Sequence, residues 1–180
     1  MAAWTALLRG INVGGHRLLP MKELITLLEG AGFTKVRSYL QSGNIVFRSP
    51  RSTAAPALGN RIGRLVKDAK GFEPAVWVLS LAELSAAVPA NPFPEADADP
   101  KSLHLYFLSE SPASADVEDL HRLKRGKESF KLKERVFYLY TPGGFAGSKL
   151  AAQAERLLGD SATARNWRTV NRLLEMAQDL

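Results

Sequence analysis

Apolar residues recur along the chain with two spacings, which predict strands and helices in a fixed order. Four short segments of the first half are predicted to be strands: residues 4–9 and 75–79 are apolar, and residues 36–41 and 45–48 flank the glycine-containing turn 42–44 of a hairpin. Between them, apolar residues follow helical spacing after Pro20 and again over residues 58–69. Gly63 inside the second helix weakens that expectation, because Gly costs about 1 kcal/mol relative to Ala. The predicted order is βαββαβ.

The second half repeats this order of elements. Its predicted strands cover residues 103–108, 130–133, 136–140 and 162–165. One helix is expected to open at Ser111-Pro112, a second at the capping residue Ser148, and a further helix ends the chain. Split βαβ units of this kind are ferredoxin-like. The chain is therefore predicted to be an α+β protein of two ferredoxin-like (βαββαβ) subdomains packed into one body, with an extra C-terminal helix.

A proline-rich segment separates the two halves. Ser80 and Glu83 have the spacing of a capping box and predict a short helix before this segment. Four prolines then fall within residues 89–100, which excludes a helix or a central strand. The predicted organisation has three parts: residues 1–88 with a trailing helix, the connector 89–101, and residues 102–180.

Composition limits the classes of function. The chain has 180 residues, 46% of them hydrophobic, and no cysteine, which excludes disulfides, thiolate catalysis and the usual zinc sites. Its three histidines lack ligand spacing, so neither a metal centre nor a cofactor is predicted. The apolar start is too short for a signal peptide and no apolar run could cross a bilayer, which predicts a cytoplasmic protein without membrane contact.

The positive charge is concentrated in one segment. The net charge is +6, and residues 122–135 alone hold seven basic and two acidic residues. Such a segment attracts phosphate-bearing partners, including nucleic acid, although a solvated helix end followed by a hairpin has the same composition.

A glycine-rich loop follows the first predicted strand. Its glycines allow positive φ and close approach of backbone amides to a ligand, while its polar side chains supply donors. The loop lacks the Lys and Ser/Thr of a P-loop and the spacing of a dinucleotide fingerprint, so both are excluded. An anion-binding loop and a purely structural turn both remain open. The candidate residues are Arg9, Gly10, Asn12, Gly14, Gly15 and Arg17.

The predicted topology brings this loop to the first hairpin. Strands one and two run the same way, so the loop and the turn after strand two share one edge of the sheet. The expected neighbours in the hairpin are Gln41, Ser42 and Asn44. They could complete a pocket of amides and guanidinium groups for an anion, or they could simply form a good turn.

A second candidate edge is predicted in the other half. The loop after strand 136–140 and the end of strand 162–165 should leave the same edge, where helix starts favour anions. Ordinary helix capping, with the Trp as a core residue, explains the same residue types. The candidates are Ser148, Lys149, Arg165, Asn166, Trp167 and Arg168.

Several of these stretches together resemble a known bacterial family. They are Leu7–Gly15 with the sequence LLRGINVGG, 39–47 with YLQSGNIVF, 90–93 with ANPF, 147–150 with GSKL and 164–170 with ARNWRTV. They look like the signature stretches of domain of unknown function 1697, and the match extends over nearly the whole chain. The resemblance implies two ferredoxin-like halves and no established activity.

Three functions therefore stay open. The favoured hypothesis is a protein that binds a phosphate-bearing ligand, a nucleotide or a nucleic acid, at its glycine-rich basic loops. The alternative is a small acylphosphatase-like hydrolase that uses Arg9 with Asn12 or Asn44, an analogy at the level of the fold. The third is a partner-binding scaffold. The oligomeric state is not predicted.

Overall fold

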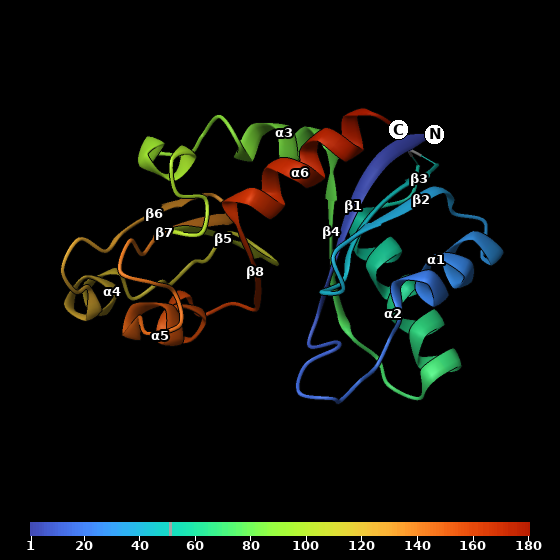
Figure 1. Cartoon of the computed structure of the whole chain (residues 1–180), viewed down its shortest axis with the longest axis horizontal. Helices are drawn as coiled ribbons and strands as arrows, with labels where there is room; N and C mark the ends of the chain where they lie inside the picture. Colours follow the sequence, from blue (N-terminus) through green and yellow to red (C-terminus); the bar gives the residue numbers. More distant parts are fainter. Residues whose placement is uncertain (51) are drawn as a thin grey trace. The chain divides into compact units, whose positions relative to one another are not determined.

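The computed structural model describes residues 1–50 and 52–180 as a mixed α+β protein with two four-stranded antiparallel sheets and six α-helices (Figure 1). The chain divides into two compact units. The first comprises residues 1–86 and 172–180, and the second comprises residues 87–171. The sequence had placed the whole C-terminal helix with the second half, whereas the contacts divide this helix between the two units.

The first unit follows the predicted order of elements. They are β1 (Ala2–Arg9), α1 (Met21–Gly30), β2 (Thr34–Tyr39), β3 (Asn44–Ser49), α2 (Ala55–Lys70) and β4 (Ala75–Ser80), followed by α3 (Leu81–Ala87). The strands hydrogen-bond in the order β2-β3-β1-β4, all antiparallel. The capping box before α3 is confirmed, because Ser80 Oγ accepts from the Glu83 amide and the Glu83 carboxylate accepts from the Ser80 amide.

Both faces of the first sheet are covered. Trp4, Ala6 and Leu8 of β1 point into the core under α1 and α2. Thr5 and Leu7 point to the opposite face and are also buried. The C-terminal residues 172–180 belong to this unit, where Lys35 Nζ donates to the carbonyl of Leu180.

Helix α2 is continuous in spite of its two glycines. A Cβ at Gly59 would lie 2.8 Å from the carbonyl oxygen of Val76, and one at Gly63 would lie 3.3 Å from that of Pro74. The helix backbone therefore packs directly on β4 and the residues before it, which explains why a residue of poor helix propensity occurs here twice. This close packing outweighs the propensity cost that had weakened the prediction.

The second unit repeats the order of the first. Its elements are β5 (Leu103–Leu108), α4 (Val117–Leu123), β6 (Ser129–Lys133), β7 (Val136–Tyr140), α5 (Lys149–Leu158), β8 (Ala162–Asn166) and the beginning of α6 (Trp167–Gln178). The strand order is β6-β7-β5-β8, again antiparallel throughout. Helices α4 and α5 contact each other on one face of this sheet, over a core that includes Tyr106, Phe137 and Leu139 (Figure 1).

One predicted helix boundary is wrong. Ser111-Pro112 does not open α4, which begins at Val117 after the N-cap Asp116. The Asp116 carboxylate accepts from the amide of Asp119, and the Asp116 amide donates to the carbonyl of Leu157 in α5. This tertiary bond fixes the helix start five residues later than the local signal at Ser111 indicated.

The proline-rich connector packs on the second sheet. Residues Pro94–Asp97 form a 3₁₀-helix, and Phe93 stacks on Tyr140 with ring centroids 5.4 Å apart. The Tyr138 hydroxyl donates to the carbonyl of Ala87 at 2.7 Å, and burial raises the pKa of Tyr138 to about 12. Tyr138 and Tyr140 alternate with the core residues under α4 and α5, so the connector covers the opposite face of the sheet.

We predict that Gly43→Ala destabilises the protein far more than Gly15→Ala. Both glycines have positive φ, of 80° and 77°, so each substitution costs about 1 kcal/mol in backbone strain. A Cβ at Gly43 would also lie 2.7 Å from Leu8 Cβ and 2.9 Å from Ile11 Cδ1, whereas nothing lies within 4 Å at Gly15. Urea unfolding should show an additional loss of about 2 kcal/mol or more for Gly43→Ala. Equal losses in the two variants would contradict the close approach of the hairpin to β1.

Candidate functional site

The first candidate edge is built around the side-chain amide of Asn12. Its Nδ2 donates to the carbonyls of Leu19 at 2.9 Å and Gln41 at 2.7 Å, and its Oδ1 accepts from the amide of Leu19 at 2.8 Å. The predicted convergence of the first loop with the β2–β3 turn is thus confirmed. The same bonds use both N–H groups of the Asn12 amide within the protein.

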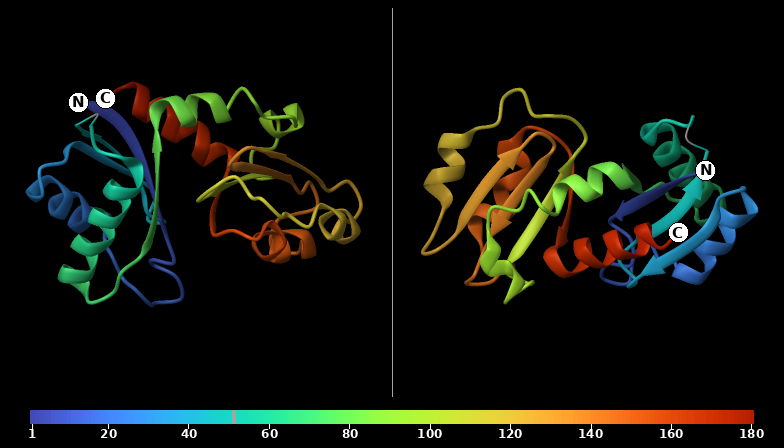
Figure 2. Two further views of the ribbon diagram at one scale, coloured as in Figure 1. Left: turned by 180° about the vertical axis from the view of Figure 1, so that it is seen from behind. Right: turned by 90° about the horizontal axis from the view of Figure 1, so that it is seen from above.

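Asn12 closes residues 12–19, here called the first loop, into a narrow hairpin. The backbone amide of Asn12 donates to the carbonyl of Arg17, and His16 and Val13 form a β-bridge. Gly14 and Gly15 form the turn between them, both with positive φ. This loop lies beyond the end of the first sheet (Figure 2). Its glycines serve as turn residues, in agreement with the structural alternative for this loop.

The turn between β2 and β3 is stabilised in a similar way. Asn44 is fully buried, and its Nδ2 donates to the carbonyl of Tyr39 and to Ser42 Oγ, both at 2.9 Å. Gln41 Oε1 accepts from the amide of Met21 at 3.4 Å, at the start of α1. Of the predicted pocket, Gln41, Ser42 and Asn44 therefore maintain the local structure.

The remaining candidates of this edge are exposed. Arg9, Gly10, Gly14, Gly15 and Arg17 all lie at the surface. The guanidinium carbon of Arg17 lies 5.9 Å from the centre of the Phe72 ring. The edge thus offers surface cations, while the side-chain amides of Asn12, Gln41 and Asn44 are engaged in bonds within the protein.

At the second candidate edge, most predicted residues have structural roles. Ser148 caps α5 by accepting from the amide of Ala151, and Asn166 caps the start of α6 by accepting from that of Thr169. Trp167 is buried and donates from Nε1 to the Asp97 carboxylate at 2.8 Å. These contacts agree with ordinary helix capping and a core position for Trp167, the alternative to an anion site that the sequence had left open.

The basic residues predicted at the second edge do not face one common site. Arg165 lies opposite Leu105 in the β5–β8 register, so its side chain is on the face of the sheet away from α4 and α5. Its Nη1 donates to Thr163 Oγ1 and to the carbonyl of Ala164. Burial lowers the pKa of Arg165 to about 10, so it stays charged at neutral pH. Arg168 is exposed, and Lys149 lies on α5.

Lys149 instead contributes to a groove between α4 and α5. This α4–α5 groove has a volume of about 680 Å³, and its lining holds three basic side chains and one carboxylate. The lining residues are Asp119, Arg122, Leu123, Lys149, Ala152, Gln153 and Arg156. Sequence reasoning had singled out Lys149 and the segment containing Arg122. It missed Arg156, for which the only signal was its position seven residues after Lys149, on the same face of α5.

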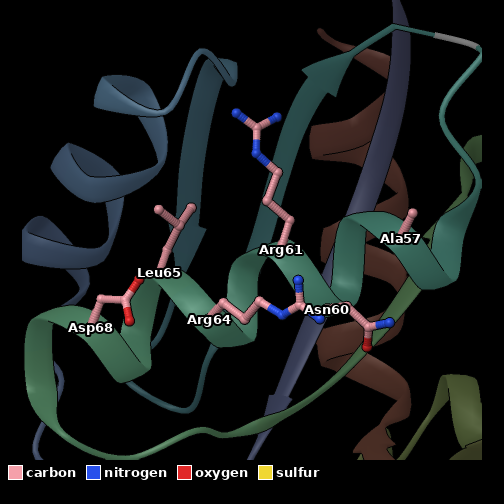
Figure 3. A pocket seen from close by; sticks show the side chains of 6 residues that line it. All are labelled: Ala57, Asn60, Arg61, Arg64, Leu65 and Asp68. Carbon is pink, nitrogen blue, oxygen red and sulfur yellow. The ribbon is translucent and has the colours of Figure 1, made fainter.

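A second recess, of about 460 Å³, lies on α2. All its lining side chains come from this helix, and Arg61 points away from Asn60 and Arg64 (Figure 3). Arg61 donates to the carbonyl of Ala31 and lies over the Phe33 ring at 4.8 Å. Apart from Arg61, the lining of this recess holds one cation, Arg64, and one carboxylate, Asp68, against three cations and one carboxylate in the α4–α5 groove, so it suits an anion less well.

The described part of the chain holds no group of three or more His, Cys, Asp or Glu side chains that could bind a metal ion. Among the same residues, no helix is long and apolar enough to span a membrane.

The comparisons with known proteins identify the family. The family model described as "Protein of unknown function (DUF1697)" matches residues 1–138. The chain belongs to the DUF1697 family. In the DUF1697 chain, the match ends within β7 and does not extend to α5, so it includes Arg122 but not Lys149 or Arg156. A search of curated proteins found no match.

A solved structure shares the fold of this DUF1697 protein. It is the conserved bacterial protein SP0830 from Streptococcus pneumoniae, with a TM-score of 0.68 and 22% sequence identity over 98% of each chain. At this identity, the likeness concerns the fold alone.

His104 is a half-buried ionisable group that sequence reasoning left unassigned. Its ring stacks on Phe145 of the 141–148 loop with centroids 3.7 Å apart, and its Nδ1 is buried without a hydrogen-bond partner. Burial lowers the pKa of His104 from 6.5 to about 4. The folded protein therefore holds this imidazole neutral.

We predict that His104 makes the protein less stable as the pH falls from about 6.5 to about 4. In this window the unfolded chain binds a proton at His104 that the folded chain does not bind, so unfolding is favoured. Replacing His104 by Leu should remove up to about 2 kcal/mol of the stability lost between pH 7 and pH 5 in urea titrations. His121→Leu, at an exposed position, is the matched control. The hypothesis is wrong if the wild type and His104→Leu lose stability in parallel.

Proposed function

We propose that this protein binds a phosphate-bearing ligand in the α4–α5 groove. The observation that carries the proposal is the approach of three basic side chains, Arg122, Lys149 and Arg156, from two different helices to one recess. Basic side chains at hydrogen-bonding distance from a phosphate form charge-assisted bonds, which are about twice as strong as neutral ones. Gln153 adds an amide to the same lining.

The local backbone supports the binding of an anion. Lys149 is the first residue of α5, where the helix dipole presents its positive end. The groove also adjoins the basic segment 122–135 at Arg122. The long-range field of that segment would raise the local concentration of an anionic ligand.

The nature of the ligand follows from the size of the groove. A volume of about 680 Å³ is within the range of small-ligand sites, so we favour a nucleotide or another small phosphate ester over a nucleic acid. An acylphosphatase-like hydrolase at the first edge stays a prediction. It is less well supported, because Asn12 and Asn44 already donate to protein oxygens and are not poised for a water.

We also propose that both units are ferredoxin-like. The βαββαβ element order and the antiparallel strand orders β2-β3-β1-β4 and β6-β7-β5-β8 support this assignment.

We predict that Lys149→Gln combined with Arg156→Gln weakens the binding of inorganic pyrophosphate by about tenfold or more at low salt. Two cations are lost, and each charge-assisted bond contributes about 1.5–3 kcal/mol. Isothermal titration calorimetry of the full chain would measure this change. Lys101→Gln, an exposed substitution in the same unit and outside the groove, is the matched control and should leave the affinity unchanged.

Three outcomes would count against the groove. Pyrophosphate does not bind the wild type at low salt, or both variants lose affinity equally, or binding is insensitive to added salt. A short RNA that binds the wild type and the double variant equally would assign any phosphate binding to the wider basic surface.

A further inference from the structure

Exposed apolar side chains gather at the end of the first sheet. Five large apolar side chains are exposed in the part of the chain that the structure describes, and three of them, Val13, Leu18 and Leu40, are 66%, 60% and 56% exposed. Val13 follows Asn12 in the sequence. Leu18 and Leu40 directly precede Leu19 and Gln41, the two residues that the Asn12 side chain hydrogen-bonds. The Asn12 amide therefore holds the backbones of all three in one place.

The backbone here is fixed in an unfavourable conformation. Asn12, Arg17 and Leu40 have φ of 53°, 50° and 59°, in the left-handed region that disfavours residues other than Gly and Asn. At Leu40, an exposed position in a turn, Gly or Asn would fit this conformation with less strain. Leu40 thus keeps a large apolar side chain exposed on a strained backbone, which indicates a role at the surface.

The charged side chains of this segment are basic. Arg9 and Arg17 belong to it, and residues 1–22 contain no Asp or Glu. The surface thus combines apolar side chains with cations. Phosphates alone would gain nothing from Val13, Leu18 or Leu40, whereas a protein segment can complement both features.

We propose that the first loop and the turn at Leu40 form a docking surface for a protein segment that carries apolar side chains flanked by carboxylates. The hydrogen bonds that hold the loop favour this use, because a surface that is already ordered loses little conformational entropy on binding. The small area predicts a weak, transient complex. This proposal is independent of the α4–α5 groove, since it rests on different residues in the other unit.

The probe for this surface is a library of phage-displayed random peptides of about twelve residues, selected on the full-length protein. Enriched peptides should combine large apolar residues with Asp or Glu. As synthetic peptides they should bind the wild type in fluorescence polarisation, with affinity that falls as salt is added. The variant Leu18→Ser with Leu40→Asn should weaken this binding by about tenfold or more.

Two controls separate binding from folding. Leu40→Asn alone suits the left-handed backbone, so it should unfold in urea no more easily than the wild type while still weakening binding several-fold. Val117→Ser changes an exposed apolar residue of α4 and should leave the peptide affinity unchanged. The proposal is overturned if no acidic apolar peptide is enriched, if Val117→Ser has the same effect, or if the enriched peptides bind Leu40→Asn as tightly as the wild type. Enrichment of basic peptides would equally overturn it.

Discussion

The side-chain amide of Asn12 organises the end of the first sheet. Its three hydrogen bonds join the first loop to itself and to the β2–β3 turn, at distances between 2.7 and 2.9 Å. An Asp at this position has no N–H groups to donate, and a Gln is one methylene too long for the same geometry. Asn also tolerates the φ of 53° observed here. The backbone segments that carry Val13, Leu18 and Leu40 are joined through this one side chain.

The two units share one backbone hydrogen bond between the end of their first strand and the hairpin turn, but they differ in the side chains around it. Leu8 donates its amide to the carbonyl of Gly43 in the first hairpin turn, and Leu108 donates to the carbonyl of Arg135 in the second, at 2.8 and 2.9 Å. After Leu8 the chain makes the Asn12 hairpin, whereas beyond Leu108 the backbone of Ser109 bonds to the carbonyl of Ser161 at the start of β8. The common strand order therefore sets where each loop leaves the sheet, and the loop residues decide what is exposed there.

The order of elements could be predicted from the sequence because apolar spacing and capping residues are local signals. Ser148 and the Ser80–Glu83 box cap helices as expected, and the first loop meets Gln41 as the topology required. The start of α4 could not be predicted, since it depends on a bond from Asp116 to Leu157, 41 residues away in sequence. The role of Asn12 could not be predicted either, because an Asn that binds an anion and an Asn that closes a loop can occur in the same local sequence.

The α4–α5 groove was missed because it depends on which faces of two helices meet. Arg122 lies in a segment with obvious charge, but Arg156 follows 34 residues later and is separated from it by two strands. The basic residues of the chain also differ in how much of each side chain remains available to bond an anion. Arg165 is half-buried and donates to Thr163, and Arg61 donates to the carbonyl of Ala31 and lies over Phe33, so part of each guanidinium is already engaged. The net charge of +6 therefore overstates what an anion could use.

The ion pairs of Arg122 decide whether that residue can contribute to the groove. Its guanidinium contacts Glu118 at 2.6 Å and Asp119 at 2.7 Å, yet its side chain remains 66% exposed. Exposed pairs between neighbouring turns of a helix stabilise by about 0.3–0.5 kcal/mol each. A phosphate that displaced these carboxylates would therefore forfeit little stability, and the two acids weaken the groove for an anion without closing it.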